Sequence, residues 1–225
     1  MKKTIFILIT SLLGTALLAQ SDMATNGNNA PGEKYMKAME ALVPAVDTTH
    51  SIEGLADLAN SFERIATAEK SQWLPYYYAA LCNINMANMY FQQQKPDRID
   101  PLADKAEPML NKAEELEKNN SEISLLKKMY NTARMMADPM SRFMTYIGPI
   151  AEALEAAKKL DPANPRVYLI EGIDKYYTPE QYGGSIEEGK KLFAEAAKKM
   201  ESFKPISNIH PSWGAGQIKY FMSLE

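Results

Sequence analysis

From about residue 34 onward, apolar side chains recur at alternating intervals of three and four positions, which is the spacing of one face of an α-helix. The segment 51–70 is a clear example, with Ile52, Leu55, Leu58, Ala59, Phe62, Ile65 and Ala66 on one side. Segments 73–93 and 121–137 continue the pattern. Alternating β-branched runs bounded by turns, which would indicate strands, do not occur. The pattern predicts an all-α protein.

Residues that favour helix starts divide this pattern into separate helices. An aspartate or asparagine followed by proline combines a side chain that accepts a backbone N–H with a residue that is tolerated in the first turn. Such pairs are Asp100-Pro101, Asp138-Pro139 and Asn164-Pro165. The stretch Ser185-Ile186-Glu187-Glu188 has the form of a capping box. We therefore predict helices that begin at each of these positions, and a last helix that begins at His210-Pro211.

The N-terminal end has a different composition from the rest. Lys2 and Lys3 precede an apolar run that ends at Leu18 and is followed by Ala19, the layout of a secretory signal peptide. We expect residues 1–19 to be the signal peptide, 20–33 a disordered tether and 34–225 a single helical-repeat domain. An uncleaved N-terminal anchor is the alternative. We expect the protein to be exported to the periplasm and not to insert into a membrane after signal cleavage.

Charge argues against one class of partner. The formal net charge is −3 at pH 7, and it becomes −5 when Lys2 and Lys3 leave with the signal. The remaining lysines and arginines form no cluster that could face a phosphate backbone. We expect no nucleic-acid partner.

The candidate chemistry is sparse. His50 and His210 stand alone, without metal-ligand spacing. The single cysteine, Cys82, lies in an apolar stretch and is expected to be a buried small hydrophobe. Adjacent glutamates point about 100° apart on a helix and lie among lysines here. We expect no catalytic residue, no metal site and no cofactor, so the protein is not expected to be an enzyme; a Cys82 nucleophile is kept as a third hypothesis.

Helix pairs with a small-x-x-large ending recur along the chain. The pairs are Ala113/Leu116, Ala157/Leu160 and Ala197/Met200, at intervals of 44 and 40 residues. The stretch ALEAAKKLDPANPRVYLIEG resembles the boundary between two tetratricopeptide repeats, although the standard repeat has 34 residues. The resemblance implies a tetratricopeptide-like α-solenoid of antiparallel helix pairs.

Short stretches of the chain resemble two families. SFERIATAEKSQWLPYYYAAL, LDPANPRVYLIEG, TPEQYGGSIEEGKKLF and HPSWG are together similar to an exported tetratricopeptide-like family of bacterial envelopes without an assigned activity. YGGSIEEGKKLF also resembles an insertion in the T-component, the helical accessory subunit of tripartite ATP-independent periplasmic transporters. The second resemblance implies a helper of small-molecule uptake.

The double glycine Gly183-Gly184 has two interpretations. It lacks the preceding strand of a dinucleotide-binding loop and the lysine of a P-loop. A turn that lets Ser185 cap the next helix is the favoured interpretation, because glycine adopts a positive φ at little cost. A surface loop beside a binding groove is the alternative.

Aromatic side chains indicate a recognition surface. Three consecutive tyrosines cannot all face one interior, so at least one is expected to be exposed, and exposed tyrosine suits a binding surface. The candidate partner-binding residues are Trp73, Tyr76, Tyr77, Tyr78, Arg166, Tyr168 and Tyr182. The methionines between residues 86 and 144 are interpreted mainly as core filling; copper binding or an adaptable partner surface are the alternatives.

Two functions fit these features. The first is a non-enzymatic periplasmic module that binds a peptide or protein partner, because repeat folds expose an extended surface. The alternative is a small-molecule-binding accessory protein of an envelope transport system, with a small apolar ligand. A pocket of several hundred Å³ closed on most sides would favour the small molecule, and an open groove with exposed aromatic residues would favour the partner.

Overall fold

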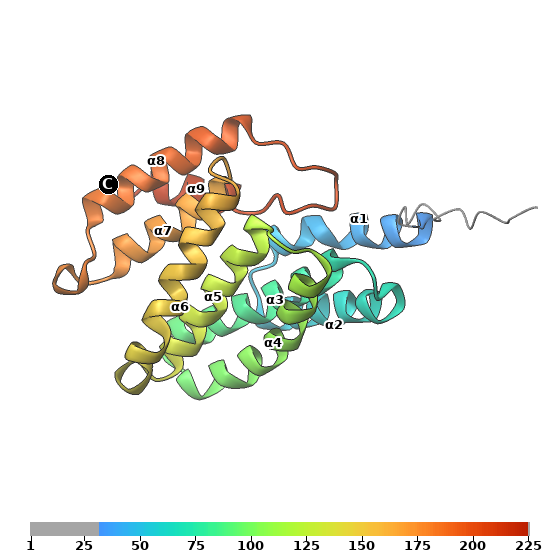
Figure 1. Cartoon of the computed structure of the whole chain (residues 1–225), viewed down its shortest axis with the longest axis horizontal. Coiled ribbons are helices and arrows are strands. Elements are labelled where there is room, and N and C mark those ends of the chain that lie inside the picture. The colour runs from blue at the N-terminus through green and yellow to red at the C-terminus, as the bar shows by residue number, and fades with distance from the viewer. Residues whose placement is uncertain (1–31, 225) are drawn as a thin grey trace, which may run out of the picture. The chain divides into compact units, whose positions relative to one another are not determined.

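A computed structural model describes residues 32–224, so the predicted signal peptide and nearly all of the predicted tether lie outside the described residues. The described part is all-α and contains no strand, as the sequence predicts (Figure 1). Its helices are α1 (Glu33–Thr48), α2 (Ile52–Glu69), α3 (Trp73–Gln92), α4 (Ile99–Leu116), α5 (Ser121–Ala137), α6 (Pro139–Leu160), α7 (Pro165–Tyr177), α8 (Ile186–Ser202) and α9 (Ala215–Met222), with short 3-10 turns η1 (Pro96–Arg98) and η2 (Glu180–Tyr182).

Three of the predicted helix starts are confirmed by their capping contacts. Asp138 accepts a hydrogen bond from the backbone N–H of Ser141 at the start of α6. Asn164 and Ser185 cap α7 and α8 in the same way. These contacts join residues two or three positions apart, so the local sequence is sufficient to specify them.

Two predicted starts are wrong. α4 begins at Ile99 because η1 leads directly into it, and the Asp100 carboxylate pairs with Arg134 and Arg142 instead of capping. The last helix begins at Ala215, not at His210. The preceding Gly214 has a left-handed φ of 102°, and its N–H donates to the Asp47 carboxylate on α1.

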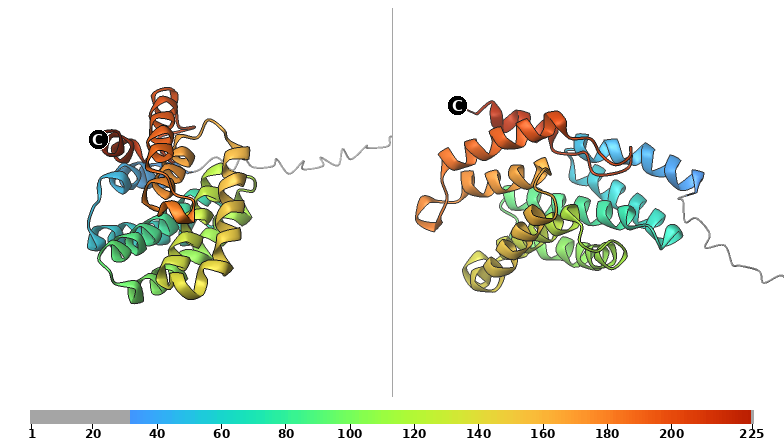
Figure 2. Two further views of the ribbon diagram at one scale, coloured as in Figure 1. Left: turned by 90° about the vertical axis from the view of Figure 1, so that its left-hand side faces the viewer. Right: turned by 45° about the horizontal axis from the view of Figure 1, so that its top comes forward.

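Consecutive helices pack side by side as pairs (Figure 2). The largest interfaces join α5 to α6, α3 to α4, α7 to α8 and α2 to α3. Alanines with no exposed surface lie along these contacts and let the helix backbones approach closely: Ala79, Ala80, Ala103, Ala106, Ala113, Ala157 and Ala196. Most buried apolar side chains form one cluster to which all nine of these helices contribute. The predicted helix-pair packing is confirmed.

The α6–α7 pair departs from this regular packing. The two helices meet at the turn between Leu160 and Pro165, and they then diverge, so that the beginning of α6 and the end of α7 are separated in each view (Figures 1 and 2). α6 packs mainly against α5 and only narrowly against α7. The first half of α6 therefore lacks the neighbour that the helix pairing elsewhere provides.

The double glycine closes a tight turn between α7 and α8. Gly183 has a left-handed φ of 89°, which favours glycine. A Cβ atom on Gly184 would lie 1.7 Å from the Thr178 carbonyl oxygen. The backbone N–H of Ser185 donates to the Lys175 carbonyl at 2.8 Å, which fixes the turn. The backbone conformation at Gly183 and the lack of space at Gly184 both favour glycine, and this supports the turn interpretation.

Replacing Gly184 by alanine is expected to destabilise the fold by about 2–4 kcal/mol, because the new methyl group meets backbone atoms that cannot rotate away. Gly216→Ala in α9 is the matched control, since nothing lies within 4 Å of that position. Urea unfolding followed by circular dichroism measures both variants. Equal midpoints for Gly184→Ala and the unmodified chain would show that the turn tolerates a side chain.

Candidate functional site

The first half of α6 exposes a row of large apolar side chains. Met140, Phe143, Met144 and Ile147 follow the spacing of one helix face. Met140 is 95% exposed, Met144 83%, Phe143 43% and Ile147 41%. We call these four residues the α6 apolar face. A contiguous exposed apolar surface of this kind marks an interaction site more often than scattered single residues do.

Contacts made elsewhere on α6 show which way this face points. Arg142, on another side of the helix, binds the Asp100 carboxylate of α4 at 2.7 Å. Lys158 lies five helical turns after Met140 on the same side, and it binds the Glu171 carboxylate of α7 at 2.6 Å. The α6 apolar face is therefore the α7-facing side of α6, left uncovered because α7 diverges.

Buried charges lie between α5 and α7. The Lys128 ammonium of α5 is 2% exposed and binds the Asp174 carboxylate of α7, with a shortest distance of 2.5 Å. Glu171 lies on the same helix as Asp174. Its Oε2 atom is buried without a hydrogen-bond partner, while its Oε1 atom accepts a hydrogen bond from the Lys158 ammonium. Lys128 and Lys158 are thus both paired with carboxylates of α7.

Exposed aromatic residues lie at the end of α7 and on α9. Tyr177 and Tyr220 are more than half exposed, and Tyr177 contacts Phe221 edge to face. Phe221 stacks on Phe193 of α8 with ring centroids 4.4 Å apart. Desolvation, with the phenols of Tyr220 and Tyr176 adding to it, raises the pKa of Tyr177, so its side chain is a neutral phenol at pH 7.

Three of the sequence-predicted partner-binding residues are buried. The Tyr77 hydroxyl accepts from the Trp213 indole N–H at 2.9 Å, and the Tyr78 hydroxyl donates to the Ile209 carbonyl at 3.1 Å. Arg166 is 1% exposed. As folded, these side chains belong to the interior and are not part of any surface.

The other four predicted residues come from three separate elements. Trp73 and Tyr76 are partly buried at the start of α3, and the Tyr76 hydroxyl donates to a carbonyl of α2. Tyr168 packs under the Lys199 ammonium, 4.5 Å from its ring centroid. Tyr182 is 70% exposed on η2. Tyr182 alone of the seven is a freely exposed aromatic residue.

The methionine interpretation needs a partial correction. Met86 and Met129 do fill the core, but Met140 and Met144 are the most exposed methionines in the described part of the chain. Their helical spacing was visible in the sequence. It identifies an apolar face, but it does not tell whether another helix covers that face.

The cysteine and the two histidines are not part of α6. Cys82 is fully buried in α3, and desolvation raises the pKa of its thiol to about 12. His50 lies in the turn between α1 and α2, and His210 in the segment between α8 and α9. Within residues 32–224, no group of three His, Cys, Asp or Glu side chains is arranged to hold a metal ion.

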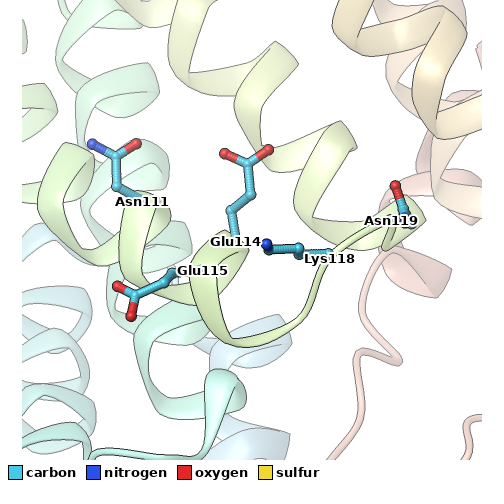
Figure 3. A pocket seen from close by; sticks show the side chains of 5 residues that line it. All are labelled: Asn111, Glu114, Glu115, Lys118 and Asn119. Carbon is cyan, nitrogen blue, oxygen red and sulfur yellow. The ribbon is translucent and has the colours of Figure 1, made fainter.

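Two hollows of the described residues are lined by polar and charged residues. One of about 530 Å³ lies at the end of α4, where Asn111, Glu114, Glu115, Lys118 and Asn119 fan out without converging on a point (Figure 3). The second, on α2, is lined by Asn60, Glu63, Arg64 and Thr67. Neither hollow is lined by a large apolar side chain, so the α6 apolar face is the better candidate site for an apolar ligand. No helix among residues 32–224 has the length and apolar character that a membrane span requires.

Comparison with known proteins gives one informative relative. No protein-family profile matches the chain, and no curated protein sequence matches it. A solved structure does, that of the HusA haemophore from Porphyromonas gingivalis, with 33% sequence identity, 85% of this chain and 92% of that chain covered, and a TM-score of 0.73. The chain belongs to the family of this haemophore.

This relationship corrects the functional prediction. The sequence favoured a module for a peptide or protein partner, but the relative is a haemophore, a protein that binds a small molecule. The small-molecule alternative is therefore the better supported one. A closed pocket was expected to favour the small-molecule alternative. The candidate site found on α6 is instead an exposed apolar surface.

Proposed function

We propose that this protein is an exported, non-enzymatic haem-binding protein. The observation that carries the proposal is the relationship to the HusA haemophore over 92% of that chain. Haem is a planar macrocycle with two apolar faces and two carboxylates at one edge, so an extended apolar surface can bind one of its faces. The α6 apolar face offers such a surface.

The side chains of the site fit face contact better than iron ligation by imidazole. Met140, Phe143, Met144 and Ile147 supply aliphatic, thioether and aromatic groups, which pack well against a flat π-system. The high exposure of Met140 and Met144 shows that no other part of the described chain covers their side chains. Neither histidine lies on α6 or α7, so the porphyrin is held chiefly by burial of its faces.

Titration of haemin into the mature protein, followed by the porphyrin absorbance, tests the proposal. We expect saturable binding of one defined stoichiometry, confirmed by native mass spectrometry. Metal-free protoporphyrin IX should bind within about tenfold of haemin, because the proposed contacts do not use the iron. No binding of either compound would refute the function, and binding of haemin alone would refute recognition by face contact.

A further inference from the structure

Among residues 32–224, the two most exposed methionines occupy the same site. Met140 and Met144 stand one helical turn apart on the α6 apolar face, whereas Met39 and Met86 are buried. Met222 on α9 is half exposed but lies on another element. A thioether on a protein surface is open to oxidants, and a buried one is protected.

We infer that Met140 and Met144 form an oxidative modification site through which peroxide weakens binding of the ligand. The inference rests on the proposed function. In the modification step the methionine sulfur attacks one oxygen of hydrogen peroxide, the O–O bond breaks, and the second oxygen leaves as water after proton transfer. The sulfur is oxidised by two electrons to a sulfoxide, and the peroxide is reduced.

The product changes the chemistry of the site at its most exposed positions. A sulfoxide is polar and accepts hydrogen bonds, whereas a thioether is soft and apolar. A porphyrin face that covers the α6 apolar face would strip water from the sulfoxide oxygen without offering it a donor, which is unfavourable. Methionine sulfoxide reductases reverse the modification, so the site can return to its binding state.

The test uses the mature protein without ligand. It is treated with hydrogen peroxide, freed of peroxide, analysed by peptide mass spectrometry, and then titrated with haemin. Once Met140 and Met144 are converted to sulfoxides, the affinity is expected to fall by at least about tenfold relative to the untreated chain. Treatment with both epimer-specific reductases should restore it.

Two variants locate the effect. Met222→Leu removes an exposed methionine outside the site and should lose affinity on oxidation as the unmodified chain does. The double variant Met140→Leu/Met144→Leu should bind haemin with the same affinity before and after peroxide treatment, whatever that affinity is. Unchanged binding of the fully oxidised chain, or an equal loss in the double variant, would overturn the inference. Failure of the untreated chain to bind haemin would instead refute the proposed function, and this inference with it.

Discussion

Replacing Met144 by glutamate is expected to weaken haem binding by at least about 30-fold, the equivalent of about 2 kcal/mol. Met144 is 83% exposed on the α6 apolar face, so the side chain is available to a ligand that lies there. A carboxylate at this position would be covered by the porphyrin without a cationic partner. Lys128 and Lys158, the cations that reach toward α7 on this side, are already bound to Asp174 and Glu171.

The neighbouring residue supplies the control. Thr145 is also exposed, but a rotation of 100° places it off the α6 apolar face, on the side away from α7. Thr145→Glu introduces the same charge into the same helix and should leave the affinity within about twofold. Circular dichroism should show both variants folded, since neither side chain is buried. Equal affinities for the two variants in a haemin titration would place the ligand elsewhere on the protein.

The local parts of the fold could be predicted from the sequence. The starts of α6, α7 and α8 follow from Asp138, Asn164 and Ser185, because a cap acts within three residues. The start of α9 could not be predicted. The segment before it is held by the Tyr78 hydroxyl and by Asp47, which are contributed by α3 and α1 far away in the sequence. Such tertiary contacts override the local preference of a His-Pro pair for a helix start.

Three of the predicted partner-binding residues are buried for a related reason. Periodicity shows that a side chain lies on an apolar face, but only the arrangement of helices decides whether that face is covered. Tyr77 and Tyr78 satisfy their hydroxyls inside the core, through partners contributed by the C-terminal segment. Met140 and Met144 lie opposite a helix that diverges. The burial of the two tyrosines and the exposure of the two methionines both depend on segments distant in the sequence, so the neighbouring residues do not reveal them.

Replacing Arg166 by methionine is expected to destabilise the protein by about 3–5 kcal/mol and to lower the melting temperature by roughly 10 °C. Arg166 on α7 is 1% exposed and holds the Glu122 carboxylate of α5 through Nε, at 2.9 Å. Its guanidinium also lies 4.4 Å from the Phe203 ring centroid and 5.7 Å from that of Trp213. Burial alone would lower the pKa of Arg166, but Glu122 raises it above its ordinary value, so the arginine is charged.

The loss arises because the variant leaves Glu122 in the interior with only neutral donors, chiefly the Asn164 amide at 2.7 Å. Calorimetry of Arg166→Met, Glu122→Leu and the double variant forms a thermodynamic cycle. The double variant should be more stable than Arg166→Met, since no unpaired charge remains buried. Lys191→Met, which breaks the exposed pair with Glu187, is the control and should melt as the unmodified chain does. If Arg166→Met has the same melting temperature as Lys191→Met, the α5–α7 contact does not depend on the ion pair. Apolar packing against Phe203 and Trp213 would then suffice to hold the C-terminal segment in place.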